Sequence, residues 1–132
     1  MIMRFLLDTC ALIWSITGYE RLEPVYRLFT NPANDFFYSP MSIWEIAIKY
    51  EKGKTNISSE IALEYAIKQD FYELPVSTDH ILQVNTINYP EGLKHRDPFD
   101  NVLVAQAKGE GLMLMTGDEV IKQYRESCIF GI

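Results

Sequence analysis

Residues 2–17 read IMRFLLDTCALIWSIT, and this stretch decides the fold. Apolar residues dominate both faces of segment 2–7, which is typical of a strand that is buried on both sides of a sheet. Thr9–Thr17 follows with a short helical pattern that ends at Gly18. Asp8 stands at the junction of the two segments. A strand followed at once by a helix is the repeating unit of an α/β fold.

The rest of the chain continues this alternation of strands and helices. We expect helices at 22–29, 39–53, 59–69, 79–87, 97–111 and from 118 onward, and strands at 36–38, 74–76, 112–115 and 128–130. Two helices begin at Ser39-Pro40 and Asp97-Pro98, because Ser and Asp cap free amide groups and proline fits the first helical position. The pattern predicts a single domain over residues 1–132, with a mainly parallel sheet between two helical layers (α/β/α).

The composition is that of an ordinary globular protein. Hydrophobic residues make up 48% and charged residues 23% of the chain, which argues against disorder and against a fibrous protein. Arg4 and Asp8 interrupt the apolar N-terminal stretch, so this stretch fits neither a signal peptide nor a membrane span. We therefore expect a cytoplasmic protein without a membrane segment. Cys10 and Cys128 lack a His/Cys spacing pattern, which indicates two reduced core cysteines.

Four carboxylates occupy positions at or near predicted strand ends and helix starts. Asp8 and Asp118 each follow a predicted strand, and open α/β sheets bind their ligands beyond the carboxyl ends of the strands. Glu45 lies in the second turn of one predicted helix, and Asp100 lies in the first turn of another. We expect Asp8, Glu45, Asp100 and Asp118 to form one acidic site.

Two of these carboxylates lie on apolar helix faces. The residues three, four and seven positions after Asp100 are all apolar, which places its carboxylate on or beside the buried face. Glu45 is flanked on its own face by Met41 and Ile48. Burying a lone carboxylate is costly, and a metal ion or a hydrogen-bonding partner would offset that cost.

Capping and ion pairing remain open as alternative roles for these side chains. Aspartate is a favoured N-cap residue. Three aspartates precede predicted helices: Asp8, Asp97 and Asp118. Asp100 also suits the first turn of its helix, where the helix dipole favours negative charge. Glu45 has a possible partner in Lys49, four residues on.

The donor types indicate the chemistry of such a site. Carboxylates that lie close together raise one another's pKa values, and hard divalent cations such as Mg²⁺ or Mn²⁺ resolve the repulsion. A site made of carboxylates without histidine favours phosphoryl chemistry over peptide hydrolysis. We therefore expect a metal-dependent nuclease in which a metal-activated water attacks the phosphodiester.

The charge balance is less favourable to that function. A net charge of −6 weighs against nucleic-acid binding, where basic surface normally supplies the affinity, although a bound cation would reverse the local field. Basic clusters at 49–54 and 94–96 are available, and each is equally well explained as solvated surface. His80 is expected on the surface at a helix start, and His95 is a minor candidate for a phosphate contact.

Four segments, in this order, resemble the motifs of PIN-domain proteins. They are LLDTCALIW at 6–14, SIWEIAIK at 42–49 with Gly53-Lys54 after it, HRDPFD at 95–100 with VAQA at 104–107 after it, and TGD at 116–118. Each motif alone is weak, but together they run through nearly the whole chain. The likeness is greatest to the virulence-associated protein C (VapC) branch, the toxins of type II toxin–antitoxin pairs.

This resemblance implies a Mg²⁺- or Mn²⁺-dependent endoribonuclease that cuts cellular RNA such as tRNA or rRNA. It implies a homodimer held inactive by a small antitoxin, and a sheet of four or five strands. The carried-over acidic residues, as catalytic residues and metal ligands, are Asp8, Glu45, Asp100 and Asp118. Asp97 matches the pattern either as a ligand or as a helix cap, and Thr116 matches a position beside a ligand or a metal-bound water. Asn101 departs from the pattern, because many relatives carry arginine there.

Other functions fit parts of the pattern. A PIN-type nuclease of RNA processing or DNA metabolism has the same motifs, although the short chain favours the toxin. A catalytically silent relative that only binds a partner is less consistent with an intact set of four acids. A phosphate-signalling receiver domain would need an acidic pair after its first strand, where this sequence has only Asp8.

Overall fold

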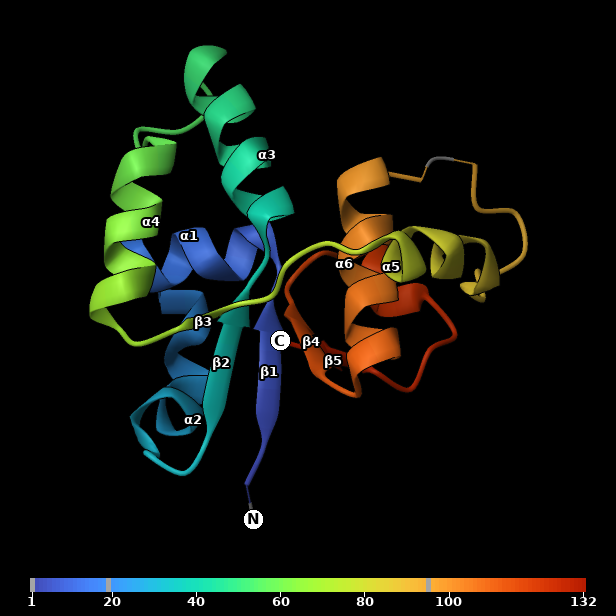
Figure 1. The fold of residues 1–132 in the computed structure, drawn as a ribbon, viewed down its shortest axis with the longest axis horizontal. Helices are drawn as coiled ribbons and strands as arrows, with labels where there is room; N and C mark the ends of the chain where they lie inside the picture. The colour runs from blue at the N-terminus through green and yellow to red at the C-terminus, as the bar shows by residue number, and fades with distance from the viewer. Residues whose placement is uncertain (1, 19, 95) are drawn as a thin grey trace.

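A parallel sheet forms the centre of the protein, in a computed structural model that describes residues 2–18, 20–94 and 96–132 (Figure 1). The strands of this described part are β1 (Arg4–Leu7), β2 (Asp35–Tyr38), β3 (Tyr72–Glu73), β4 (Met113–Thr116) and β5 (Ile129–Gly131). Their order is β3-β2-β1-β4-β5, and each neighbouring pair is parallel. β1 is therefore the central strand, and its carboxyl end lies beside that of β4.

Helices cover both faces of this sheet. They are α1 (Thr9–Thr17), α2 (Tyr26–Thr30), α3 (Pro40–Glu51), α4 (Ser59–Lys68), α5 (Thr78–Gln83) and α6 (Pro98–Glu110), with 3₁₀ turns η1 (Glu20–Val25), η2 (Val84–Thr86) and η3 (Ile121–Gln123). Figure 1 shows α1, α3 and α4 together on one side of the sheet, and α5 and α6 on the other. The predicted three-layer α/β/α fold with a parallel sheet is confirmed.

Successive side chains of β1 pack into two separate hydrophobic cores. Phe5 and Leu7 pack into the core shared with α1, α3 and α4, whereas Leu6 packs into the core shared with α6. All three side chains are fully buried. Burying a side chain of this size contributes about 1.5–3 kcal/mol, so the unbroken apolar run is what two-sided burial requires.

Helix caps place the first residues of α1, α3 and α6 as the sequence predicts. Asp8, Ser39 and Asp97 are the three N-caps, and each side chain accepts a hydrogen bond from a backbone amide of the first turn. Gly18 ends α1 with φ 68°, and Gly111 ends α6 with φ 69°. Glycine reaches this left-handed conformation at no steric cost, so both helices end at glycines that the sequence pattern indicates as helix ends.

The predicted position of a strand at 74–76 is wrong. The edge strand β3 is Tyr72–Glu73, and it pairs with Phe37 and Tyr38 of β2. Pro75 interrupts the expected segment, and proline has no amide hydrogen for a sheet ladder. Both residues of β3 are exposed, so an apolar pattern could not reveal it.

The predictions of a helix at 22–29 and of a helix from 118 onward are also wrong in part. The first is the 3₁₀ turn η1, which contains Pro24, followed by the short α2. The second is a turn after Asp118 and then only η3. Within the described residues, the structure has no helix with the length and apolar character needed to span a membrane.

Candidate active site

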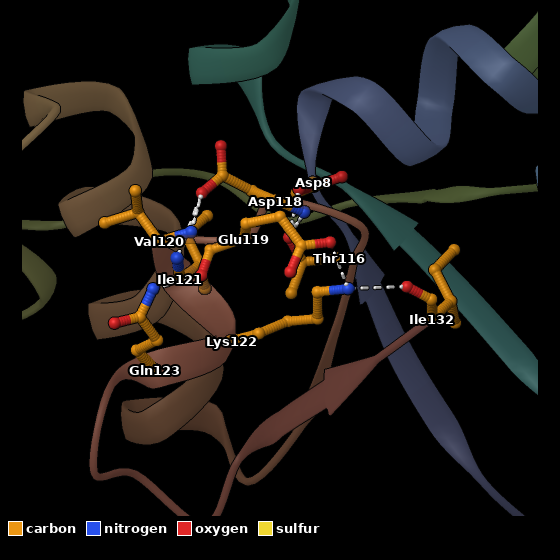
Figure 2. Close-up of polar contacts among 9 residues, drawn as sticks. All are labelled: Asp8, Thr116, Asp118, Glu119, Val120, Ile121, Lys122, Gln123 and Ile132. Atoms are coloured by element: carbon orange, nitrogen blue, oxygen red, sulfur yellow. Dashed lines mark hydrogen bonds and ion pairs between the residues drawn. The ribbon is translucent and has the colours of Figure 1, made fainter.

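The carboxyl ends of β1 and β4 meet at Asp8 and Thr116. Leu7 lies opposite Met115 in the sheet, and the Asp8 amide donates to the Met115 carbonyl at 3.1 Å. Thr116 Oγ1 donates to Asp8 Oδ2 at 2.5 Å and accepts from the Asp118 amide at 3.0 Å (Figure 2). One buried hydroxyl therefore links the two aspartates that follow these strands.

Asp8 is a helix cap and a buried carboxylate at once. Its side-chain Oδ1 accepts from the Ala11 amide at 2.7 Å, so the capping role considered for it is present. Only 2% of the residue is exposed. Burial raises the pKa of Asp8 to about 6, although the hydrogen bonds from Thr116 and Ala11 lower it. The charges of Asp118 and Glu45 raise the pKa further.

Asp118 also makes local hydrogen bonds. Its Oδ1 accepts from the amides of Val120 and Ile121 at 2.8 and 3.0 Å. Figure 2 shows one carboxyl oxygen directed at these amides, while the other points away from them. The side chain is thus held by a turn rather than by the helix that was expected there, and it keeps an oxygen for a second role.

Glu45 pairs with Lys49 through only one of its oxygens. Oε2 lies 3.3 Å from Lys49 Nζ on the next turn of α3, so the considered ion pair exists. Oε1 is buried and has no hydrogen-bond partner among the described residues. Buried polar oxygens are nearly always satisfied, so an orphaned carboxylate oxygen indicates a missing cationic or hydrogen-bonding group.

Asp100 is a partly buried carboxylate on the first turn of α6. Burial, followed by the charges of Asp97, Asp118, Glu45 and Asp8, raises the pKa of Asp100 to about 8. Of these carboxylates, Asp8 and Asp118 follow β1 and β4, Glu45 lies on α3, and Asp97 is the N-cap of α6. Asp97 itself is exposed and accepts from the Asp100 amide at 3.1 Å, as an N-cap does.

The four predicted acids do not form a ready metal cage in the described part of the chain. Among residues 2–18, 20–94 and 96–132, no three Asp, Glu, His or Cys side chains already stand in a metal-holding arrangement. Three observations nevertheless fit a hard divalent cation. The donors are all carboxylate oxygens, the buried Glu45 Oε1 lacks a partner among the described residues, and burial together with the charges of neighbouring carboxylates raises the pKa of Asp100.

The carboxyl edge of the sheet, with the predicted acids Asp8, Glu45, Asp100 and Asp118, is called the acidic edge below. A hydrogen bond between two hydroxyl groups connects the elements at this edge, and the sequence patterns did not reveal it. Thr9 Oγ1 donates to Ser42 Oγ at 3.0 Å, and both residues are buried. This bond joins the first turn of α1, directly after Asp8, to the helix that carries Glu45. The only sequence signal was that each hydroxyl lies within three residues of a predicted acid.

His80 and Cys10 have structural surroundings in the described part of the chain. His80 is 3% exposed, which contradicts the surface position expected for it. Its Nδ1 accepts from the Ser77 amide and its Nε2 lies 2.9 Å from Glu110, so it connects α5 to α6. His95 lies outside the described residues. Burial and the charge of Asp8 raise the pKa of Cys10 to about 12, which keeps this thiol protonated.

Asn101, which departs from the PIN pattern, has a structural contact. Its side chain is buried, and its Oδ1 accepts from the Tyr124 hydroxyl at 3.1 Å. This hydrogen bond ties α6 to the segment after η3. Asn101 therefore supports the helix that carries Asp100.

A hollow of about 930 Å³ lies away from the acidic edge. Its walls come from η1, α2, α4 and the start of β2, including Glu23, Phe36 and Tyr65. None of the four predicted acids lines it. The predicted acids therefore lie outside this hollow.

Known structures share this fold over nearly the whole chain. A chain of VapBC2 from Rickettsia felis, bound to a promoter DNA fragment, has a TM-score of 0.69 at 15% identity, covering 98% of this chain and 99% of that one. A chain of DNA-bound VapBC from Salmonella typhimurium has 0.67 at 20% identity, with 98% of each chain covered. A toxin–antitoxin complex from Klebsiella pneumoniae has 0.61 at 17% identity, with 96% and 98% covered.

The comparison with curated proteins gives no match. The sequence profile of the PIN domain, in contrast, matches residues 5–127. That range contains the four predicted acids, the strands β2, β3 and β4 and all of β1 but its first residue, and it ends before β5. The chain therefore belongs to the PIN-domain family, whose members are nucleases.

Proposed function

We propose that this protein is a metal-dependent endoribonuclease and the toxin of a type II toxin–antitoxin pair. It would hydrolyse phosphodiester bonds of cellular RNA as a single PIN domain in the cytoplasm. The observation that carries the proposal is the buried Glu45 Oε1, which has no partner among the described residues, on a PIN-domain chain in which Thr116 joins Asp8 to Asp118. Carboxylates near the carboxyl ends of parallel strands, where such sheets bind ligands, support a site for a divalent cation.

The proposed metal ligands are Asp8, Glu45, Asp100 and Asp118. PIN nucleases generally use divalent metal ions, and oxygen donors suit Mg²⁺ or Mn²⁺. When bound, such an ion lowers the pKa of a water and stabilises charge on a phosphodiester. Two metals would add a clamp on the leaving oxygen.

Other residues of the chain hold these proposed ligands in position. Thr116 holds Asp8 Oδ2 and the Asp118 amide, which fixes the distance between two ligands. Lys49 holds Glu45 Oε2 and leaves Oε1 available. Asp97 caps α6 and adds negative charge beside Asp100, so we assign it a supporting role.

The comparisons support an antitoxin as a partner of the proposed toxin. The similar structures are VapBC complexes, a toxin–antitoxin complex and FitAcB from Neisseria gonorrhoeae. We propose that this chain is bound by a small antitoxin and that it forms a homodimer. A short reading frame beside its gene, encoding a DNA-binding N-terminus, would support the toxin over a nuclease of RNA processing or DNA metabolism.

The test is RNA cleavage by the purified protein, free of any antitoxin. We expect cleavage of single-stranded RNA with Mg²⁺ or Mn²⁺, and none with EDTA. Asp100→Asn and Asp8→Asn should abolish cleavage while far-ultraviolet circular dichroism stays unchanged. Asp79→Asn is the matched control, because Asp79 is an exposed first-turn aspartate of α5.

Two outcomes would contradict the proposal at different points. Absence of RNA cleavage with either metal would overturn the enzymatic function. Cleavage by the Asp100→Asn and Asp8→Asn variants at the wild-type rate would overturn the site, even if the protein proved to be a nuclease.

A further inference from the structure

Two aromatic rings stand beside the acidic edge. Trp44 precedes Glu45 on α3, and Phe99 precedes Asp100 on α6. The ring centroids lie 5.0 Å apart at an interplanar angle of 66°, an edge-to-face pair that joins the two helices. Each ring is thus the chain neighbour of a proposed metal ligand.

Trp44 is open to solvent although it is the larger ring. It is 58% exposed, whereas the side chain of its neighbour Glu45 is 13% exposed. Successive helix residues point about 100° apart, so the indole lies on the solvent side of the carboxylate. Contact with Phe99 holds the indole in one orientation and leaves more than half of it uncovered.

The charges of the chain indicate what such a ring could contribute. The net charge is −6, and the lysine nearest the acids, Lys49, is already paired with Glu45. Coulomb attraction to phosphates is therefore a weak source of affinity here. Stacking of a base on an aromatic face does not depend on that attraction, and it tolerates any base because each has a π-face.

We propose that Trp44, oriented by Phe99, is a stacking platform for a nucleobase next to the scissile phosphate. This inference rests on the proposed function and narrows its substrate class to nucleic acid with an unpaired base at the cleavage site. Bases that are splayed out of a helix are the ones that aromatic side chains can reach. A base pair inside a duplex presents no free face to the indole.

The matched control lies on the same helix. Tyr50 is 51% exposed, also aromatic, and six residues beyond Trp44 on α3. Replacing Trp44 or Tyr50 by alanine removes exposed apolar surface from α3. Only the Trp44 replacement removes a ring next to a proposed metal ligand. Trp44→Phe keeps an aromatic ring at the site and leaves Trp14 as the remaining tryptophan.

The experiment measures binding of a single-stranded 2′-deoxy oligonucleotide, with an abasic strand of equal length and a blunt duplex as comparisons. Mg²⁺ is present, and gels confirm that the strand stays intact. Trp44→Ala should weaken binding roughly five- to 150-fold, the range for loss of one stacked base. Tyr50→Ala should bind within about twofold of wild type, and Trp44→Phe should recover most of the loss.

Fluorescence gives a second measurement of the same contact. The base-bearing strand should quench wild-type tryptophan emission, and the abasic strand should not. In Trp44→Phe the quenching should disappear, because the remaining emission comes from Trp14. Binding should also show a shallow salt dependence, since few phosphate contacts are involved.

Several results would overturn the proposal that Trp44 stacks on a nucleobase. These are equal binding by wild type and Trp44→Ala, equal loss in Tyr50→Ala, or equal binding of base-bearing and abasic strands. A changed oligomeric mass of Trp44→Ala with unchanged oligonucleotide affinity would instead assign the ring to a protein contact. Metal-dependent RNA cleavage by wild type would stand in each case, so failure of the platform is distinguishable from failure of the proposed function.

Discussion

Thr116 Oγ1 donates a hydrogen bond of 2.5 Å to Asp8 Oδ2, across 108 positions of sequence. The same oxygen accepts from the Asp118 amide at 3.0 Å. Thr116 is fully buried, and β1 and β4 are neighbours in the centre of the sheet. A single hydroxyl therefore sets the relative position of two proposed metal ligands that lie far apart in the chain.

Thr116→Val should destabilise the protein by about 1–3 kcal/mol, because a buried carboxylate oxygen and a backbone amide lose their partner while the side-chain volume is kept. Thr116→Ser keeps the hydroxyl and should lose less. Urea unfolding followed by circular dichroism measures both. Equal stability of the Val variant and wild type would contradict the role given to this hydroxyl.

The stability of the metal-free protein should fall as the pH rises. The pKa of Asp8 is about 6 and that of Asp100 about 8 in the folded protein, both raised from 3.8, chiefly by burial. The unfolded chain releases these protons near pH 4, whereas the folded protein keeps them, so it binds more protons between pH 4 and 8. The free energy of unfolding in EDTA therefore decreases across that window.

Asp100→Asn should flatten this decrease between pH 6 and 8, because the amide does not titrate. Asp79→Asn, on the exposed start of α5, should leave the pH profile as in wild type. Urea unfolding at several pH values provides the profile. A wild-type stability that rises from pH 5 to 8 in EDTA would show that the buried carboxylates are not the groups that titrate.

Divalent cations should reverse this trend. Binding to the charged carboxylates stabilises the folded state, and the effect should be larger at pH 8 than at pH 5, where protons compete for the same oxygens. The melting temperature with and without Mn²⁺ measures it. Glu45→Gln should reduce the shift, whereas an equal shift in Glu45→Gln and wild type would remove Glu45 from the ligand set.

Gly117, in the TGD segment, is required by its contact with Trp14. A Cβ atom at position 117 would lie 2.5 Å from Trp14 Cζ3, and Gly117 is buried. Gly117→Ala should therefore cost about 1–3 kcal/mol of stability through overpacking. Gly109→Ala, in α6, meets only the flexible Gln83 side chain and should be neutral or stabilising. Thermal unfolding of the two variants compares them, and an undiminished melting temperature for Gly117→Ala would refute this packing.

Local signals in the sequence were sufficient for the elements that form the acidic edge. The bounds of α1 were predicted as observed, because Asp8 caps its start and Gly18 closes its end. The start of α6 followed equally from Asp97-Pro98. The topology then implied that the carboxyl ends of parallel strands share one edge.

Features that depend on tertiary packing could not be predicted in this way. β3 has two exposed residues and exists only because β2 is there to pair with it. The burial of His80 depends on Glu110, thirty residues away. The hydrogen bond between Thr9 and Ser42 likewise needs α1 and α3 side by side. The assignment of the four acids as metal ligands stays a prediction.

The most direct test of that assignment is anomalous diffraction from crystals grown with Mn²⁺. The account predicts an anomalous peak about 2.0–2.3 Å from carboxylate oxygens of the proposed ligands Asp8, Glu45, Asp100 and Asp118. Glu45 Oε1, which lacks a partner among the described residues, should be among the nearest atoms. A protein that cleaves RNA with Mn²⁺ but binds the ion elsewhere, or shows no peak at this edge, would contradict it.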